Sequence, residues 1–152
     1  MEKAKGIITG INGNMLTVKF EGNVIQNEVA YAVHKEERLK SEVVRIDNDI
    51  AYMQVFERTK GLQPGDTVDF TGDLLAVELG PGLIGQIYDG LQNPLPQLAE
   101  EHGFFLSRGV VIEALDQEKK WEFTPAVEKG APVAAGYIIG HVPETQFKHA
   151  IM

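Results

Sequence analysis

The stretch Gly6-Ile-Ile-Thr-Gly-Ile-Asn-Gly-Asn-Met-Leu-Thr-Val-Lys-Phe20 sets the structural class of the first half of the chain. Its centre, Asn12-Gly13-Asn14, separates two apolar runs, and Asn-Gly is a strong hairpin signal because both residues tolerate positive φ. After the turn, Leu16, Val18 and Phe20 alternate with polar residues, so they would share one face of a β-strand. The stretch therefore predicts an antiparallel hairpin with one apolar face.

Four more strand-like runs follow this hairpin before residue 75, each bounded by turn-forming residues. The six expected strands lie at residues 6–11, 15–20, 27–33, 39–46, 50–57 and 67–71. Gln63-Pro64-Gly65-Asp66 places proline and glycine where a type II turn needs them. The run 50–57 is largely apolar on both faces, which predicts a strand packed on two sides. Short antiparallel strands at this spacing predict a mostly all-β chain that begins with a small barrel or a sandwich.

A glycine- and proline-rich stretch from Glu78 to Leu95 interrupts the strand pattern. Gly80-Pro81-Gly82 is expected to form a sharp structural turn without a ligand, because proline fixes φ while glycine can take positive values. The apolar residues from Leu83 to Leu91 recur at helical spacing, which predicts a short helix that Asn93-Pro94 ends. A second helical or coil connection is expected at 95–102.

The chain beyond residue 104 is predicted to be β-rich again. A strand is expected at 104–115, a strand-turn-strand pattern at 127–133, and a β-branched run between glycines at 136–142. Three regions follow from this pattern: a β-barrel at 1–75, a glycine- and proline-rich linker at 76–103, and a β-rich region at 104–152.

The composition narrows the possible classes of function. The 152 residues are 43% hydrophobic and 24% charged, as in ordinary globular proteins, and no cysteine is present for a disulfide or a thiolate metal site. The first residues are too polar for a signal peptide, and no apolar run approaches the about 20 residues that span a bilayer. The formal net charge is −8 with no basic stripe, which argues against nucleic-acid binding.

No catalytic, cofactor-binding or metal-binding residue is expected. The stretch from Gly80 to Gly85 has the glycines of a phosphate-binding loop, but Gln86-Ile87 stand where lysine and a hydroxyl residue are required. The motifs His34-Lys-Glu-Glu37 and His141-Val-Pro-Glu144 superficially suggest metal ligands, yet neither has the spacing of a zinc protease. We interpret all four histidines as structural or surface residues: His34, His102, His141 and His149.

A short basic and aromatic segment allows two interpretations. Lys119, Lys120, Trp121 and Phe123 lie close together in the sequence. In the first interpretation the tryptophan caps a small core. In the second these residues form an exposed interaction edge, since tryptophan is over-represented at contact hot spots.

The stretch from Glu78 to Leu95 resembles the segment that joins the N-terminal barrel to the nucleotide-binding domain in the catalytic A subunit of V-type and A-type rotary ATPases. The resemblance covers nearly the whole chain and includes the motifs Ile50-Ala-Tyr-Met-Gln-Val-Phe-Glu57, Gly61-Leu-Gln-Pro-Gly-Asp66, Arg108-Gly109, Lys119-Lys-Trp-Glu-Phe-Thr-Pro125 and Val142-Pro-Glu-Thr145. One departure is Asn93, where the family usually has arginine before Pro-Leu, so a charged contact at this point is not carried over.

This resemblance implies a barrel rather than a sandwich at the N-terminus, and a β-rich "bulge" region in the C-terminal third. It implies a parent protein that binds Mg-ATP and couples its hydrolysis or synthesis to the movement of protons or sodium ions. The expected partners are the B subunit, whose barrels alternate with those of the catalytic chains in a crown, and the peripheral-stalk subunits. The parent would be cytoplasmic and peripheral on the membrane through the assembled complex.

The family's own phosphate-binding loop lies further along than Met152. The chain by itself is therefore expected to serve assembly, neither hydrolysing ATP nor binding Mg-ATP more tightly than about millimolar. Two rival functions stay open. A free-standing β-barrel module for a small molecule or peptide would show an exposed groove lined by aromatic residues. A degenerate carrier domain would need a modified lysine, although no Met-Lys-Met motif is present.

Overall fold

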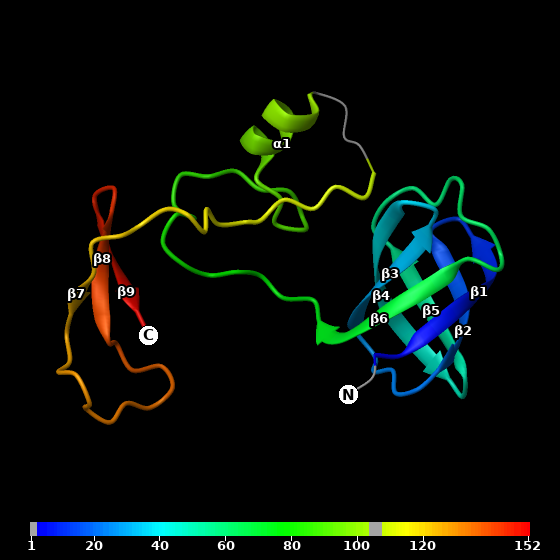
Figure 1. Cartoon of the computed structure of the whole chain (residues 1–152), viewed down its shortest axis with the longest axis horizontal. Coiled ribbons are helices and arrows are strands. Elements are labelled where there is room, and N and C mark those ends of the chain that lie inside the picture. Colours follow the sequence, from blue (N-terminus) through cyan, green and yellow to red (C-terminus); the bar gives the residue numbers. More distant parts are fainter. Residues whose placement is uncertain (1–2, 104–107) are drawn as a thin grey trace. The chain divides into compact units, whose positions relative to one another are not determined.

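The computed structural model describes residues 3–103 and 108–152, which fall into two compact units (Figure 1). The first, here called the barrel unit, comprises Met1–Ala76 together with Ser107–Val110. The second unit comprises Val77–Leu106 and Val111–Met152. The chain therefore leaves the barrel unit, returns to it for a few residues and leaves again.

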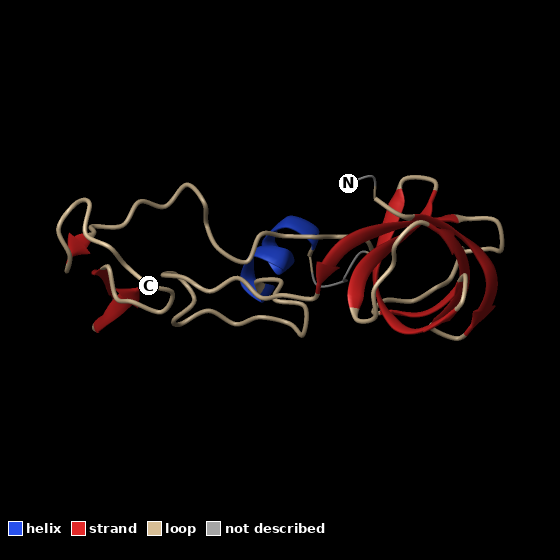
Figure 2. Cartoon of the chain, turned by 90° about the horizontal axis from the view of Figure 1, so that it is seen from below, coloured by secondary structure: helices blue, strands red, loops and turns tan. Residues whose placement is uncertain are grey.

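Six antiparallel strands form the barrel unit and close into a barrel, which confirms the predicted fold class (Figure 2). The strands are β1 (Lys5–Asn12), β2 (Met15–Glu21), β3 (Glu28–His34), β4 (Glu37–Asp47), β5 (Ile50–Val55) and β6 (Thr67–Leu74). Their order round the barrel is β1-β2-β5-β4-β3-β6, and β6 pairs with β1 to close the ring. Because a closed ring has no free edge, the backbone of every strand finds partners on both sides.

Turn chemistry sets the register of these strands. The expected hairpin joins β1 to β2, with Asn12 opposite Met15 and Gly13 at a φ of 62°. The turn at Pro64-Gly65 is also present: Gly65 has a φ of 100°, and the Asp66 N–H donates to the Gln63 carbonyl oxygen at 3.1 Å. Positive φ at this position is the requirement of a type II turn.

Alternate residues of all six strands fill the barrel. The buried apolar cluster consists of Ala4, Ile8, Leu16, Val18, Ala30, Ala32, Leu39, Val43, Ala51, Met53, Val55, Val68 and Phe70. Phe70 is 1% exposed, and its ring meets that of Phe20 edge-on at 5.8 Å. Gly6 is required by this packing, because a Cβ there would lie 2.5 Å from Val18 Cγ1 and 3.0 Å from the Phe70 ring.

The prediction that strand 50–57 packs on two sides is wrong. Strand β5 ends at Val55, and only its inward residues Ala51, Met53 and Val55 are buried. On the outer face, Tyr52 stays partly exposed beneath the Arg45 guanidinium, which lies 4.3 Å from the ring centroid. The outward Tyr52 ring is therefore covered by a side chain of the neighbouring strand β4.

The second unit has little regular structure in its described residues. It contains the helix α1 (Leu95–His102) and a three-stranded antiparallel sheet of β7 (Thr124–Pro125), β8 (Gly140–Glu144) and β9 (Phe147–Ile151), in the order β7-β8-β9. Helix α1 occupies the expected connection at 95–102, and proline in its first turn suits helix initiation. None of the helices that the structure describes is long and apolar enough to cross a membrane.

Three sequence predictions for the second unit are wrong. The stretch 83–91 is not helical, because Gly85 adopts a φ of 87° and the chain turns there instead of continuing in the α conformation. The described part of the run 104–115, from residue 108, forms no strand, since the Ile112 N–H is directed toward the Asn93 side chain at 3.4 Å. Residues 104–107 lie outside the described residues.

The run 127–133 contains a turn but no strands. Gly130 has a φ of 91°, and the Ala131 N–H closes the turn on the Glu128 carbonyl oxygen at 3.1 Å. Pro132 lacks the N–H that a strand ladder needs. The β-branched run at 136–142 contributes to β8 only from Gly140 onward.

Candidate functional site

The turn at Gly80-Pro81-Gly82 is anchored by a buried carboxylate. Gly82 has a φ of 111°, and the N–H groups of Gly82 and Ile84 both donate to Glu144 Oε1, at 2.6 and 3.1 Å. Glu144 ends strand β8 and is 1% exposed. A residue 60 positions downstream of Ile84 in the sequence thus fixes the turn.

The second oxygen of Glu144 is also occupied. His149 Nδ1 lies 2.6 Å from Oε2, across the hairpin that joins β8 to β9. Burial would raise the pKa of Glu144, but the hydrogen bonds from Gly82, Ile84 and His149 outweigh it and hold this pKa below the usual value. Burial raises the pKa of Tyr88, and the negative charge of Glu144 adds to the rise. The Tyr88 hydroxyl donates to the Ala114 carbonyl oxygen at 3.0 Å.

Apolar side chains enclose the other side of the turn. A Cβ on Gly80 would lie 3.0 Å from Leu115 Cδ1, and one on Gly82 would lie 3.6 Å from both Leu115 and the Trp121 ring. Close packing against Leu115 therefore favours glycine at position 80, whereas the backbone conformation favours it at position 82.

Sequence reasoning missed the role of Glu144: it considered the motif at 141–144 only as a possible set of metal ligands and interpreted its histidine as a structural or surface residue. A signal was available, because Val142 and Glu144 are two residues apart and therefore share a face of any strand. Val142 is buried, so the carboxylate beside it is buried too.

The rest of the glycine-proline stretch is held by a second polar centre. Asp89 Oδ1 accepts from the N–H groups of Leu91 and Asn93 at 2.9 and 2.8 Å. Gln92 and Glu78 exchange two hydrogen bonds of 2.7 Å, with the Gln92 amide bonding both the N–H and the carbonyl of Glu78. Asn93, which departs from the family pattern, donates its amide to Asp89 Oδ2 at 2.9 Å. Hydrogen bonds to side chains thus hold this stretch, in place of the backbone hydrogen bonds of a strand ladder.

The contacts just described determine whether the turn at Gly80-Pro81-Gly82 or its surroundings could bind a nucleotide or a metal ion. A phosphate cradle needs convergent backbone amides that are free to meet a phosphate. At this turn two of the amides already donate to Glu144. Within the described ranges there is no group of three or more His, Cys, Asp or Glu side chains placed to hold a metal ion.

The structure brings together part of the candidate interaction edge. Lys119 Nζ lies 4.2 Å from the centroid of the Trp121 ring, and Trp121 is partly buried where it packs on Gly82. Phe123 is instead 47% exposed and lines an open groove of about 800 Å³, with Val127, Val133 and Ile139 among its other walls. Lys120 is exposed.

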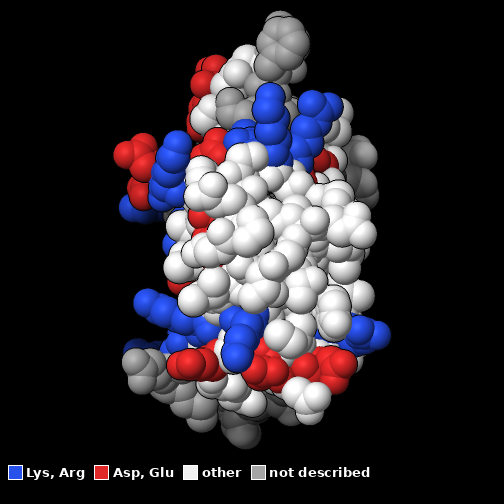
Figure 3. Space-filling model, turned by 90° about the vertical axis from the view of Figure 1, so that its right-hand side faces the viewer, with Lys and Arg blue, Asp and Glu red and all other residues white. Residues whose placement is uncertain are grey.

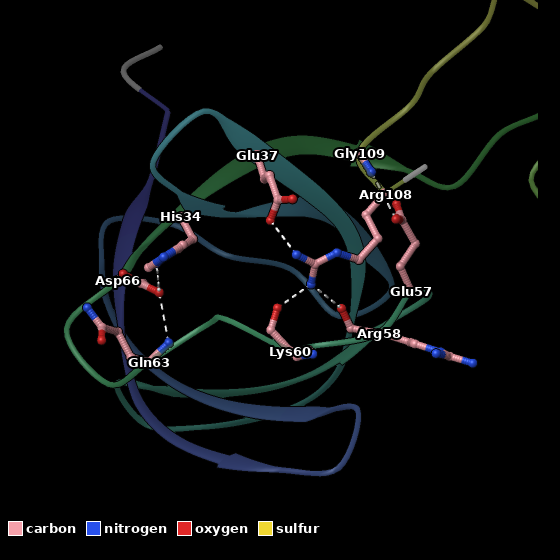
Figure 4. A network of polar contacts seen from close by, with 9 residues as sticks. All are labelled: His34, Glu37, Glu57, Arg58, Lys60, Gln63, Asp66, Arg108 and Gly109. Atoms are coloured by element: carbon pink, nitrogen blue, oxygen red, sulfur yellow. Dashed lines mark hydrogen bonds and ion pairs between the residues drawn. The ribbon is translucent and has the colours of Figure 1, made fainter. Parts of the chain in front are cut away.

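In the barrel unit, Arg108 and Gly109 bind across one end of the barrel (Figure 4). Arg108 donates from Nη2 to Glu37 Oε2 at 2.7 Å and from Nη1 to the carbonyl oxygens of Arg58, at 3.1 Å, and Lys60. The Gly109 N–H donates to Glu57 Oε2 at 2.9 Å. These contacts join the start of β4 to the loop between β5 and β6.

His34 takes part in a neighbouring contact at the same end. Its Nδ1 lies 2.9 Å from Asp66 Oδ2, the oxygen that also accepts from the Gln63 N–H at 2.8 Å. The histidine therefore helps to fix the turn before β6.

The outer surface of β1 and β2 is largely uncharged at its centre. Lys, Arg, Asp and Glu side chains gather above and below this area in the view of Figure 3. Its outward uncharged residues include Ile7, 53% exposed, together with Thr9, Met15 and Thr17, while the exposed Lys19 of β2 is the strand partner of Ile7. We call Ile7, Thr9, Met15 and Thr17 the uncharged face. Ile7 is the exposed large apolar side chain of this face, and a partner protein that packed here would cover it.

Comparisons with known proteins agree with this architecture. The model of the ATP synthase alpha/beta family, beta-barrel domain, matches residues 8–72, and that of the ATP synthase alpha/beta subunit barrel-sandwich domain matches residues 112–152. The chain therefore belongs to the ATP synthase alpha/beta family.

Similar curated proteins make the relationship more specific. The chain is 56% identical over all 152 residues to the V-type ATP synthase alpha chain of Treponema denticola and 54% identical to the V-type ATP synthase alpha chain 1 of Treponema pallidum. It is 49% identical over 150 residues to the V-type ATP synthase alpha chain of Borrelia garinii subsp. bavariensis. In each case it spans 26% of the relative's length. The resemblance identified from the sequence is confirmed.

Proposed function

We propose that this chain is the N-terminal assembly portion of the catalytic A subunit of a V/A-type rotary ATPase. The parent complex would couple ATP hydrolysis or synthesis to the transport of protons or sodium ions. The observation that carries the proposal is 56% identity over the whole chain to a V-type ATP synthase alpha chain. In this proposal the chain is cytoplasmic and reaches the membrane only through the assembled complex.

The chain's part in the complex would be contact rather than catalysis. The uncharged face on β1 and β2 would pack against the barrel of a neighbouring B subunit, where the contact would bury Ile7, which is 53% exposed. The exposed side of the second unit, including Phe123, would meet the peripheral-stalk subunits.

Mg-ATP would bind elsewhere in the parent. The glycine-rich turn at 80–85 lacks the required lysine and hydroxyl residue, and its amides already serve Glu144. Titration calorimetry of this chain at physiological salt should therefore show Mg-ATP binding no tighter than about millimolar. A stoichiometric micromolar site would contradict the proposed division of roles.

The assembly role is tested by placing a charge on the uncharged face of the full-length protein. Ile7→Asp should weaken assembly with the B subunit, seen by native mass spectrometry as loss of the oligomer. Val44→Asp is the matched control, because Val44 is a 41% exposed apolar residue on the outer side of β4. Both variants should keep the melting temperature of the wild type. Wild-type assembly of Ile7→Asp would rule out this face as the contact surface.

A further inference from the structure

Arg108 and Gly109 are bound by the barrel unit through several independent contacts. The guanidinium group meets one carboxylate, of Glu37, and two carbonyl oxygens, of Arg58 and Lys60. The next residue adds a backbone hydrogen bond to Glu57 at 2.9 Å. A planar guanidinium with several fixed donors suits such a set of acceptors, whereas a lysine could not reach them all.

Gly109 is equally specific to its place. It has a φ of 70°, and a Cβ there would lie 3.3 Å from the Arg38 carbonyl oxygen and 3.5 Å from the Arg38 nitrogen. Both the left-handed backbone and the close approach to the β4 backbone favour glycine. The barrel end is therefore shaped to receive an Arg-Gly pair.

We propose that Arg108 and Gly109 form a releasable clasp, which fixes the start of β4 to the β5–β6 loop when closed and frees both when open. The clasp lies between two segments of the second unit in the sequence, and the second unit resumes at Val111. A pull on that part of the polypeptide would reach the barrel through these two residues. The order of the β5–β6 loop would then depend on Arg108 and Gly109, which lie some 50 residues downstream of that loop.

The character of the contacts makes the clasp releasable. The Arg108 side chain is 28% exposed and that of Glu37 is 42% exposed, so water can replace their interaction. Partly exposed ion pairs weaken as salt screens them, and they contribute little compared with a buried apolar core. The barrel core a few residues away, including Leu39 and Val55, is 1% exposed. The clasp should therefore open without unfolding the barrel.

Hydrogen exchange of the Gly109 amide reports directly on the clasp, because that N–H donates to Glu57. In the whole chain, Arg108→Ala should speed exchange at Gly109 by about ten-fold or more, the size expected when hydrogen bonds to a charged group are lost. Arg108→Lys should have an intermediate effect, since it keeps the charge but loses the fork of donors. Amides of the core residues Val18 and Val43 should exchange as in the wild type.

Two further arms complete the experiment. Arg45→Ala removes an exposed arginine from the same barrel outside the clasp and should leave Gly109 exchange unchanged. Glu37→Gln should speed exchange by removing the carboxylate from the other side. Raising salt from about 0.1 to about 1 M, where the screening length falls from about 10 to about 3 Å, should reproduce part of the effect.

Unchanged exchange at Gly109 in Arg108→Ala would overturn the proposal. It would also be overturned if the core amides accelerated in parallel with Gly109, because Arg108 would then belong to the cooperative fold of the barrel. The clasp is a property of the chain itself, so these outcomes do not depend on assembly with other subunits.

Discussion

The two units of this chain are stabilised in different ways. Among the described residues, the barrel unit encloses thirteen buried apolar residues in one cluster, contributed by all six strands and the residue before β1. In the described part of the second unit, the buried apolar residues are Pro94, Leu98 and Val142. That unit instead depends on hydrogen bonds converging on Glu144 and Asp89. Apolar packing holds the first fold, while charged hydrogen-bonding centres hold the second.

This difference has a consequence for the surfaces. A unit without an extensive core leaves large apolar side chains in contact with solvent, and Leu79, Ile87 and Val111 are 80, 64 and 65% exposed. Apolar surface on that scale is typical of a region that meets other polypeptide. The second unit is therefore the one whose order should depend more on its surroundings.

The largest effect is expected from Phe70→Ala in the barrel core. Removing a ring that is 1% exposed should lower the free energy of unfolding of the barrel by about 3–5 kcal/mol, through lost burial and the cavity left behind. Far-UV circular dichroism in denaturant would measure the barrel transition. The only tryptophan, Trp121, lies in the second unit, and its fluorescence would follow that unit separately.

The exposed Val44→Ala serves as the control and should change barrel stability by less than about 0.5 kcal/mol. If Phe70→Ala shifted the Trp121 transition as much as the barrel transition, the two units would be one cooperative fold, and their stabilities would not be separate.

The next effect is expected from Glu144→Ala in the second unit. This change removes the acceptor of two backbone N–H groups and the partner of His149, so the second unit should lose about 2–3 kcal/mol. Trp121 fluorescence in denaturant would measure the loss, since the ring packs on the same turn. Glu78→Ala is the matched control, because Glu78 contributes its backbone and not its carboxylate to the bonds with Gln92.

The same residue predicts a pH dependence of definite sign. The pKa of folded Glu144 lies below its usual value of 4.5, so ionisation favours the folded state. Its contribution is fully present above pH 4.5 and is lost as the pH falls through the folded pKa. Acid unfolding of the second unit can be followed by Trp121 fluorescence. The part of this unfolding that is caused by protonation of Glu144 should be absent in Glu144→Gln. An unchanged acid transition would show that other groups control it.

The same contrast explains what the sequence could and could not predict. Barrel strands such as 15–20 alternate with a period of two and are bounded by Asn-Gly or Pro-Gly turns, so local signals and the fold agree. The helix expected at 83–91 failed because apolar spacing carries no information on φ, and Gly85 adopts a left-handed conformation. The anchor at Glu144 depends on contacts across 60 or more residues, which no local pattern reveals.

A smaller effect is expected at the turn that Glu144 holds. Gly82→Val should lower the stability of the second unit by about 1–2 kcal/mol, because a β-branched residue fits a φ of 111° poorly. Little of this cost should come from collision, since the nearest atoms to a new Cβ lie 3.6 Å away. Gly90→Val is the control, with no positive φ and no atom within 4 Å of its Cβ position. Equal losses in the two variants would remove backbone conformation as the cause.

The smallest effect on stability is expected from Glu28→Gln, which tests the contrast between the buried glutamates of the two units most directly. Each unit buries one glutamate to 1% exposure, but their hydrogen bonding differs. Glu28 Oε2 accepts from the Ile25 N–H at 3.2 Å, while Oε1 has no hydrogen-bond partner among the residues that the structure describes. Burial raises the pKa of Glu28, the Ile25 N–H opposes this, and the charge of Asp73 adds to the rise. The pKa shift of Glu28 is therefore opposite in direction to that of Glu144.

A glutamate whose folded pKa is raised stabilises the fold least when it is ionised. The barrel should be most stable, as far as Glu28 is concerned, below the usual pKa of 4.5, and should lose stability as the pH rises through the folded pKa. Glu28→Gln keeps the shape and removes the charge, so it should raise barrel stability at pH 8 by up to about 1 kcal/mol and have little effect at pH 4. Thermal unfolding followed by far-UV circular dichroism at the two pH values would measure this. A loss of stability at pH 8 would mean that ionised Glu28 has a partner that stabilises it, and that the two buried glutamates act alike.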